Sequence, residues 1–274
     1  MGRISRGWEM AKTSLRVIKK DKELLLFPVL SGVFTILIIG GFLGGMYLSV
    51  GWDGMYDGMT DYVFIGMLIA AYVLAYFVVV FFNAALIGCA MIRLEDGVPH
   101  LRDGFRIARE NLGRIVAWAL FAATVGLILR AIQQRVGFLG KILVGIVGIA
   151  WALATFFVVP VLIFEKLGPL SAMKRSSGIF KNVWGETLSG GLGLGLIFFL
   201  LGLLGLPIIV MGALLGGITG AIIGIVITLI YWIALAIVAS AASGVLVAAL
   251  YRYATTGKVS RQFASERLIA NPWR

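Results

Sequence analysis

The chain has very little of the chemistry that enzymes and metal sites use. Of its 274 residues one is cysteine (Cys89), one is histidine (His100) and only 14% are charged. A single cysteine allows no disulfide within the chain, and a zinc site needs several Cys or His ligands. A Ser-His-Asp triad would depend on His100 as its base, and no pattern places the other two members beside it. We therefore expect no catalytic residue, no metal site and no cofactor.

Charge is absent from whole stretches of the sequence. No charged residue occurs between Thr187 and Tyr251, the mean hydropathy is +1.00 and 60% of residues are hydrophobic. A soluble domain carries about 25% charged residues, whereas a membrane span needs about 20 predominantly apolar residues in a row. The composition therefore predicts an integral membrane protein.

Six apolar runs predict six transmembrane helices. The runs are Leu24–Val50, Val63–Ile92, Ile115–Leu129, Ile142–Phe164, Leu188–Leu215 and Gly216–Tyr251. The third is short, so its helix must continue past Arg130, whose long side chain can reach the interface. The last two runs are contiguous, and Pro207 or Gly216-Gly217 marks the expected turn. The first run is too long for the core of a cleavable signal peptide.

The basic residues predict the topology. All but three of the 24 Lys and Arg residues fall in four short stretches, namely Arg3–Lys22, Arg93–Arg114, Lys166–Lys181 and Arg252–Arg274. The exceptions are Arg130, Arg135 and Lys141. Basic segments stay on the cytoplasmic side, so we expect a plasma-membrane protein with both termini in the cytoplasm. This rule also accounts for the net charge of +11, which therefore does not indicate nucleic acid.

The first three basic stretches resemble one another. Setting Gly97 on Gly168 without a gap brings Asn111 onto Asn182. The first stretch aligns with the third through Lys12/Lys174, Ser14/Ser176, Val17/Ile179 and Lys19/Lys181. We infer three parallel repeats, at about 5–92, 97–164 and 168–251, followed by a cytoplasmic tail at 252–274. The predicted fold is an all-α polytopic bundle of six transmembrane helices, arranged as three hairpins that each follow a cytoplasmic amphipathic helix.

Each of these three basic stretches separates its apolar and basic residues onto opposite faces of a helical wheel. Such helices lie in the membrane interface, with the apolar face in the acyl boundary and the basic face toward phosphates. We call the basic faces the collar, and we expect it to contact anionic lipid headgroups. Its residues are Lys12, Arg16, Lys19, Arg102, Arg106, Arg109, Lys174, Arg175 and Lys181. The alternative is that these residues only set the topology and brace the bundle.

Asn83 is the most polar side chain near the middle of any predicted span. It is either an intramembrane functional site or an interhelical hydrogen-bond anchor. No Asp, Glu, Lys or His lies deep in a span, which argues against an ion-coupled transporter.

Glycines four residues apart predict close helix packing, because small residues let helix backbones approach. The pattern occurs at Gly41/Gly45 and at Gly212/Gly216/Gly220/Gly224. The glycine run from Gly190 to Gly195 is no phosphate loop, since no Gly-Lys-Ser/Thr follows it.

Both ends of the chain resemble one known family. The motifs are Gly7-Trp8, Ser14-Leu-Arg16, the run from Asp21 to Pro28, and the run from Ala249 to Gly257. They are similar to those of a prokaryotic family of six-span integral membrane proteins known only as a domain of unknown function. This resemblance implies the topology and no activity. The helix-plus-hairpin plan is more remotely similar to the membrane domain attached to some glycerophosphodiester phosphodiesterases.

These features favour a non-enzymatic multi-pass protein, a membrane scaffold or lipid-interacting protein that uses its basic collar. Its expected partners are anionic membrane lipids, with a protein partner or a second copy as further options. The alternative is a passive transporter or channel with a path between the hairpins, which would need a polar cavity near Asn83, Thr124 and Ser240. A lipid-modifying enzyme is a third option, with Glu95, Asp96 and His100 as the only set of suitable residues.

Overall fold

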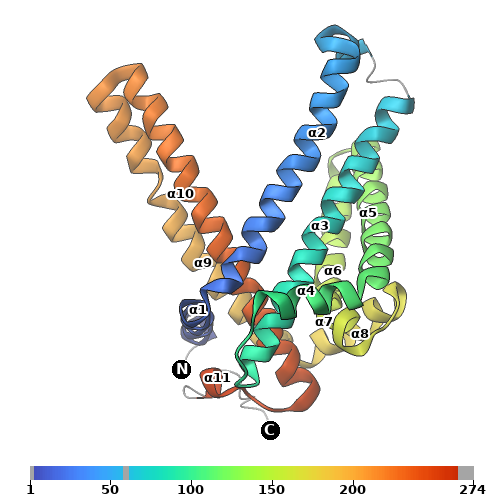
Figure 1. The fold of residues 1–274 in the computed structure, drawn as a ribbon, viewed down its shortest axis with the longest axis vertical. Coiled ribbons are helices and arrows are strands. Elements are labelled where there is room, and N and C mark those ends of the chain that lie inside the picture. The colour runs from blue at the N-terminus through green and yellow to red at the C-terminus, as the bar shows by residue number, and fades with distance from the viewer. Residues whose placement is uncertain (1–2, 58–61, 265–274) are drawn as a thin grey trace. The chain divides into compact units, whose positions relative to one another are not determined.

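A computed structural model describes residues 3–57 and 62–264, and these residues contain helices and no strands (Figure 1). The predicted all-α class is confirmed. The elements in chain order are α1 (Arg3–Lys20), η1 (Lys22–Leu25), α2 (Leu26–Asp57), α3 (Tyr62–Leu94), α4 (Leu101–Glu110), α5 (Leu112–Arg135), α6 (Phe138–Thr155), α7 (Val158–Pro160), η3 (Val161–Glu165), α8 (Pro169–Asn182), α9 (Trp184–Leu203), α10 (Leu206–Thr256) and α11 (Arg261–Ala264).

The described chain forms two compact units. The first contains residues up to Pro28, Cys89–Leu101 and the chain from Lys181 onward; the second contains Val29–Gly88 and Arg102–Phe180. The end of the predicted tail, 265–274, lies outside the described residues.

Five helical segments within the described residues are long and apolar enough to cross a membrane. They are Lys22–Leu48, Phe64–Leu94, Leu112–Arg135, Phe138–Glu165 and Trp184–Thr256. The third continues past Arg130 to Arg135, as the shortness of its apolar run required. The last is 73 residues long, far more than the roughly 20 that one crossing needs.

The 73-residue segment reverses direction at Gly217, whose φ of 57° and ψ of −138° are not helical. Two helices run side by side on either side of this turn (Figure 1). A Cβ atom on Gly212 would overlap the carbonyl oxygen of Gly220, and one on Gly224 would lie 2.9 Å from the carbonyl oxygen of Ile208. The predicted glycine packing is therefore confirmed at Gly212, Gly220 and Gly224. At Gly216, Gly41 and Gly45 a Cβ atom would meet no atom of the described chain within 4 Å, so no close packing occurs there within it.

The first arm of this hairpin is itself interrupted, between α9 and α10. Pro207 has no N–H, and its neighbours Leu204 and Gly205 make only short turns to carbonyls three residues back. The opposite arm supplies three donors to the carbonyls around the break. Their bonds are Tyr231 Oη to Leu201 O at 2.6 Å, Trp232 Nε1 to Gly202 O at 3.0 Å and Thr228 Oγ1 to Gly205 O at 3.1 Å. In hydrocarbon such side-chain donors replace the water that would otherwise satisfy a broken helix.

A second interruption lies between α6 and α7 in the other unit. Pro160 leaves the carbonyl of Phe156 without its usual donor, and the chain continues as a π-helical turn, η3, up to Glu165. The N–H of Phe157 bonds to Ser176 Oγ at 2.9 Å, away from its own helix.

Three apolar segments end in the same backbone conformation. Asp96 after α3, Lys166 after η3 and Gly257 after α10 have φ values of 64°, 55° and 69°. This left-handed geometry stops a helix, and a new helix (α4, α8 or α11) starts within five residues of each. The recurrence is what parallel repeats would produce, although the triplication itself stays a prediction.

Gly220→Ala tests the glycine contact at the Gly217 turn. We expect a loss of about 1–3 kcal/mol in the free energy of unfolding, because the new methyl group overlaps the backbone of Gly212. Gly191→Ala on α9 is the matched control, since no atom lies within 4 Å of its Cβ position. Unfolding by a denaturing detergent would measure both, and equal stability of the two variants would contradict the close contact.

Candidate functional site: the three basic helices

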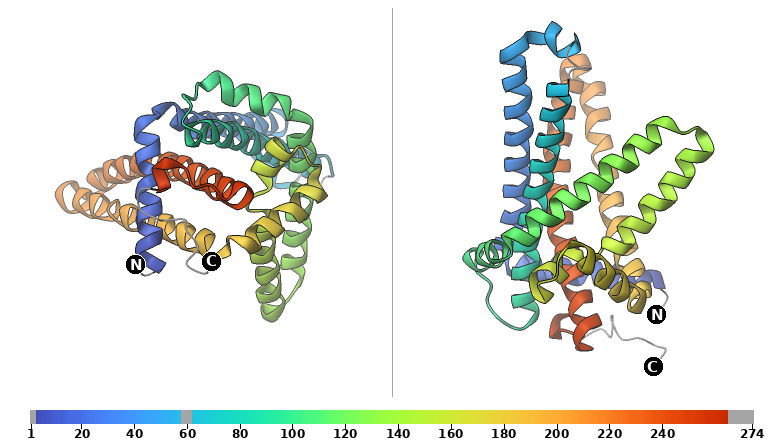
Figure 2. Two further views of the ribbon diagram at one scale, coloured as in Figure 1. Left: turned by 90° about the horizontal axis from the view of Figure 1, so that it is seen from below. Right: turned by 90° about the vertical axis from the view of Figure 1, so that its right-hand side faces the viewer.

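Helix α1 packs against α9 and α10 in the first unit (Figure 2). Met10, Ala11 and Ser14 are 0% exposed, and the Met10 methyl group lies 3.4 Å from where a Cβ atom on Gly190 would stand. The apolar face of α1 therefore contacts protein, which differs from the predicted position in the acyl boundary. Gly190 of α9 has no side chain and so leaves space for the Met10 side chain of α1.

Helix α4 packs against α3 in the second unit. The Phe105 ring lies 6.0 Å from that of Phe82 and 6.4 Å from that of Phe81. The Ile107 side chain fills the space beside Gly88, 2.9 Å from its Cβ position.

Helix α8 packs against the end of α6 in the same unit. Ser176 and Ile179 are buried, and the Phe180 ring lies 6.2 Å from that of Phe156. Each basic helix thus packs on a long helix other than the one that follows it directly in the chain. Both members of the aligned pairs Ser14/Ser176 and Val17/Ile179 are buried, in agreement with the proposed alignment.

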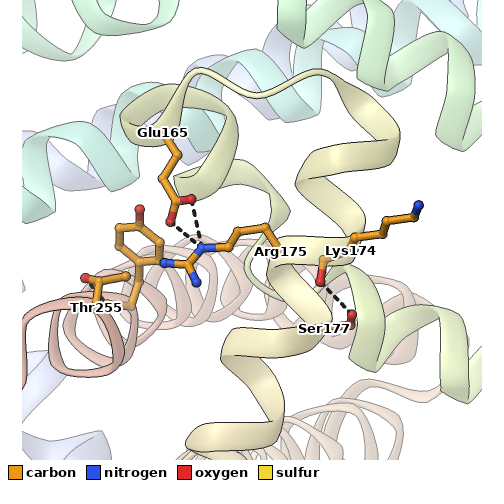
Figure 3. A network of polar contacts seen from close by, with 6 residues as sticks. Glu165, Lys174, Arg175, Ser177 and Thr255 are labelled. Atoms are coloured by element: carbon orange, nitrogen blue, oxygen red, sulfur yellow. Dashed lines mark hydrogen bonds and ion pairs between the residues drawn. The ribbon is translucent and has the colours of Figure 1, made fainter.

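Four of the nine collar residues are paired with carboxylates. Lys12 and Arg16 lie 3.0 and 3.9 Å from Glu9, and Lys12 also stands over the Trp8 ring. On the other two helices, Arg106 lies 2.9 Å from Asp103, and Arg175 lies 2.8 Å from Glu165 (Figure 3).

The other five collar residues are exposed and have no carboxylate within 4.0 Å in the part of the chain that the structure describes. They are Lys19, Arg102, Arg109, Lys174 and Lys181. Figure 3 shows the Lys174 side chain directed away from Arg175 and Glu165. Each basic helix therefore keeps at least one cation free for an external anion.

The residues that follow α3 are tied to the segment after α1. Arg93 and Asp21 form a two-point ion pair in which the side chains are 20% and 9% exposed. Glu23 accepts the Leu101 N–H at 3.0 Å and so holds the first turn of α4. Sequence reasoning missed the Arg93–Asp21 ion pair. Asp21 and Glu23 both belong to the motif from Asp21 to Pro28, on which the family resemblance rests.

The residues considered for a lipid-modifying enzyme have structural contacts. Asp96 terminates α3 in the left-handed conformation and lies 3.7 Å from Arg261. The carbonyl of His100 accepts the Cys89 thiol at 3.4 Å, and the His100 side chain is exposed. Within residues 3–57 and 62–264, no three His, Cys, Asp or Glu side chains are grouped so that they could hold a metal ion.

The intramembrane polar residues do not point to a shared site. Asn83, Thr124 and Ser240 are all exposed, and the Thr124 hydroxyl bonds to the carbonyl of Leu120 at 2.8 Å. The Asn83 side chain makes no hydrogen bond within the described chain, so its role as an interhelical anchor stays a prediction. An open groove of about 530 Å³ on α2 and α3 is apolar and does not include Asn83. It is lined by Leu37, Ile38, Gly41, Phe42, Gly45, Met46 and Met67.

Long apolar helices with short basic helices between them are typical of a multi-pass membrane protein. Residues 62–261 match the model of a family of unknown function, DUF6159, and the chain belongs to this family. No curated protein and no solved structure matched the chain. The expected membership of a family without known function is confirmed, whereas the likeness to glycerophosphodiester phosphodiesterases stays a prediction.

Asp21→Asn tests the ion pair with Arg93. We expect a loss of about 3 kcal/mol in the free energy of unfolding, because the largely buried Arg93 guanidinium loses the negative charge of Asp21. Asp96→Asn is the control, since the Asp96 and Arg261 side chains are 52% and 89% exposed. Unfolding in mild detergent would measure both. A similar small change for the two variants would contradict a structural role of the Asp21–Arg93 pair.

Proposed function

We propose that this chain is a non-enzymatic, multi-pass plasma-membrane protein whose basic collar holds anionic phospholipid headgroups. In this proposal six transmembrane helices form three hairpins, both termini lie in the cytoplasm, and the protein acts as a membrane scaffold or lipid-interacting protein. It needs no cofactor and binds no nucleic acid. A protein partner or a second copy of the chain would add to the lipid contacts.

The observation that carries the proposal is the set of five unpaired collar cations. An intramolecular carboxylate already neutralises Lys12, Arg16, Arg106 and Arg175. No such partner competes for the remaining five within the described chain. Each Lys or Arg near an anionic membrane surface contributes about 1 kcal/mol of binding.

The surroundings of these cations favour lipid over a soluble anion. Large apolar side chains lie exposed on or beside the same helices, with Trp8 37%, Leu170 57% and Trp184 54% exposed. Tryptophan is enriched where headgroups meet hydrocarbon, and an apolar side chain next to a cation suits that boundary.

The reversal at Gly217 supports six crossings. It divides the 73-residue apolar segment into two arms, and each arm has the length for one crossing. An even number of crossings places α1 and α11 on the same side. The recurring left-handed ends at Asp96, Lys166 and Gly257 support the three-hairpin arrangement.

Replacing Lys19, Lys174 and Lys181 by Gln in one variant tests the collar. The control replaces Arg130, Arg135 and Lys141 by Gln, which removes the same charge from the exposed end of α5 and start of α6. We expect the collar variant to lose about fivefold in affinity for phosphatidylglycerol for each cation that contacts the headgroup. Native mass spectrometry in mild detergent would count the retained lipids.

The control variant should retain phosphatidylglycerol like the wild type, and neither protein should prefer phosphatidylcholine. Equal, sparse phosphatidylglycerol on the wild type and the collar variant would refute the headgroup proposal. The basic residues would then serve topology alone, and a transport path between the hairpins would become the function to test.

A further inference from the structure

The backbone N–H of Phe157 bonds outside its own helix. In the structure it donates to Ser176 Oγ of α8 at 2.9 Å, and the Ser176 side chain is 0% exposed. Its ordinary helical acceptor, the carbonyl of Leu153, instead takes a long 3.4 Å bond from Phe156. If the Phe157 N–H instead donated to the Leu153 carbonyl, α6 would continue as a regular helix. The Ser176 hydroxyl would then lose the hydrogen bond that it accepts from Phe157.

The break at Phe156 is permitted by Pro160, which can never donate to the Phe156 carbonyl. The π-helical turn from Val161 to Glu165 absorbs the resulting change of register. Such turns are rare and often occur at functional sites. An unbonded N–H is costly in hydrocarbon, so the Phe157 N–H must be bonded to one acceptor or the other.

The position of α8 determines whether Ser176 Oγ is available to accept the Phe157 N–H. Besides Ser176, α8 is held by the Arg175–Glu165 ion pair, in which Nε lies 2.8 and 3.0 Å from the two carboxylate oxygens (Figure 3). The Arg175 side chain is 47% exposed, so an external phosphate can reach it. Lys174 and Lys181, on the same helix, have no carboxylate partner among the residues that the structure describes.

We propose that an anionic headgroup bound by α8 takes Arg175 from Glu165 and thereby releases α8 from the break in the membrane helix. The Phe157 N–H then returns to Leu153, and α6 changes its course at Phe156. The inference rests on the proposed function, since it adds regulation to the same collar. A phosphate can drive the change because it binds Arg175 better when Glu165 is displaced.

The distance between α6 and α8 tests the proposal. Spin labels at Ala152→Cys and Gly178→Cys, both exposed positions, would report it in a Cys89→Ser background. In phosphatidylcholine nanodiscs we expect one main distance. In nanodiscs that contain phosphatidylglycerol we expect a second population, shifted on the order of one helical turn, about 5 Å.

Two variants test the contacts that hold α8, the Arg175–Glu165 ion pair and the Phe157–Ser176 bond, independently of lipid binding. Glu165→Gln should raise the second population about fivefold in phosphatidylcholine alone, as the loss of one exposed ion pair predicts. Ser176→Ala should raise it as well, because the Phe157 N–H loses its distant acceptor. Glu186→Gln, with the same charge change on α9, and Ser177→Ala, whose hydroxyl bonds to the Lys174 carbonyl, should leave it unchanged.

Native mass spectrometry of the same samples distinguishes the two ways to fail. Bound phosphatidylglycerol with an unchanged distance would overturn the coupling and leave the headgroup proposal standing. Absent lipid would overturn the headgroup proposal, and Glu165→Gln would still decide whether the ion pair holds α8. With or without bound lipid, an unchanged distance in Glu165→Gln would overturn the claim that the Arg175–Glu165 ion pair holds α8 in place.

Discussion

Every backbone N–H and C=O group in hydrocarbon must be bonded to another part of the protein, and this constraint shapes the whole described chain. It makes the apolar runs helical, and it leaves a cost wherever a helix is interrupted. At the break around Gly205, Thr228, Tyr231 and Trp232 donate to carbonyls whose backbone bonds in the described chain are short turns to residues at most three positions on. At the break around Phe157, the hydroxyl of Ser176 accepts the freed N–H. A proline follows each break within three residues, Pro207 after Gly205 and Pro160 after Phe157. Residues from another helix stabilise both breaks.

The order and length of the apolar helices could be predicted from the sequence, because hydropathy acts locally along the chain. The turn at Gly216-Gly217 was one of two predicted options, and the structure places a helix break at the other, Pro207. Glycine spacing predicted the contact between Gly212 and Gly220 but also a contact at Gly41/Gly45 that is absent within the described residues. Glycines four residues apart show that another helix can come close to this face. Which helix does so depends on tertiary packing, and the local sequence does not determine it.

The basic helices could be recognised from the separation of their charges, but their packing partners could not. An apolar face on a short helix fits a lipid boundary and a protein surface equally well, and Met10 and Ser14 are buried by α9 and α10. The division of the collar into paired and unpaired cations depends on distances such as that from Arg175 to Glu165. These distances arise from how α8 is seated on the end of α6. The collar is thus a prediction from sequence, and its five available cations are a result of the fold.

The pairing of α1 with α9 and α10 has a consequence for biogenesis. The ribosome makes α1 before its partner helices α9 and α10, and α2, α3, α5 and α6 are made in between. At about 5–20 residues per second, the face with Met10, Ala11 and Val17 waits on the order of ten seconds for its partner. During that interval this apolar face is not yet covered by α9 and α10. The nascent chain therefore passes through an arrangement in which the apolar face of α1 lacks the cover that α9 and α10 give it in the finished protein.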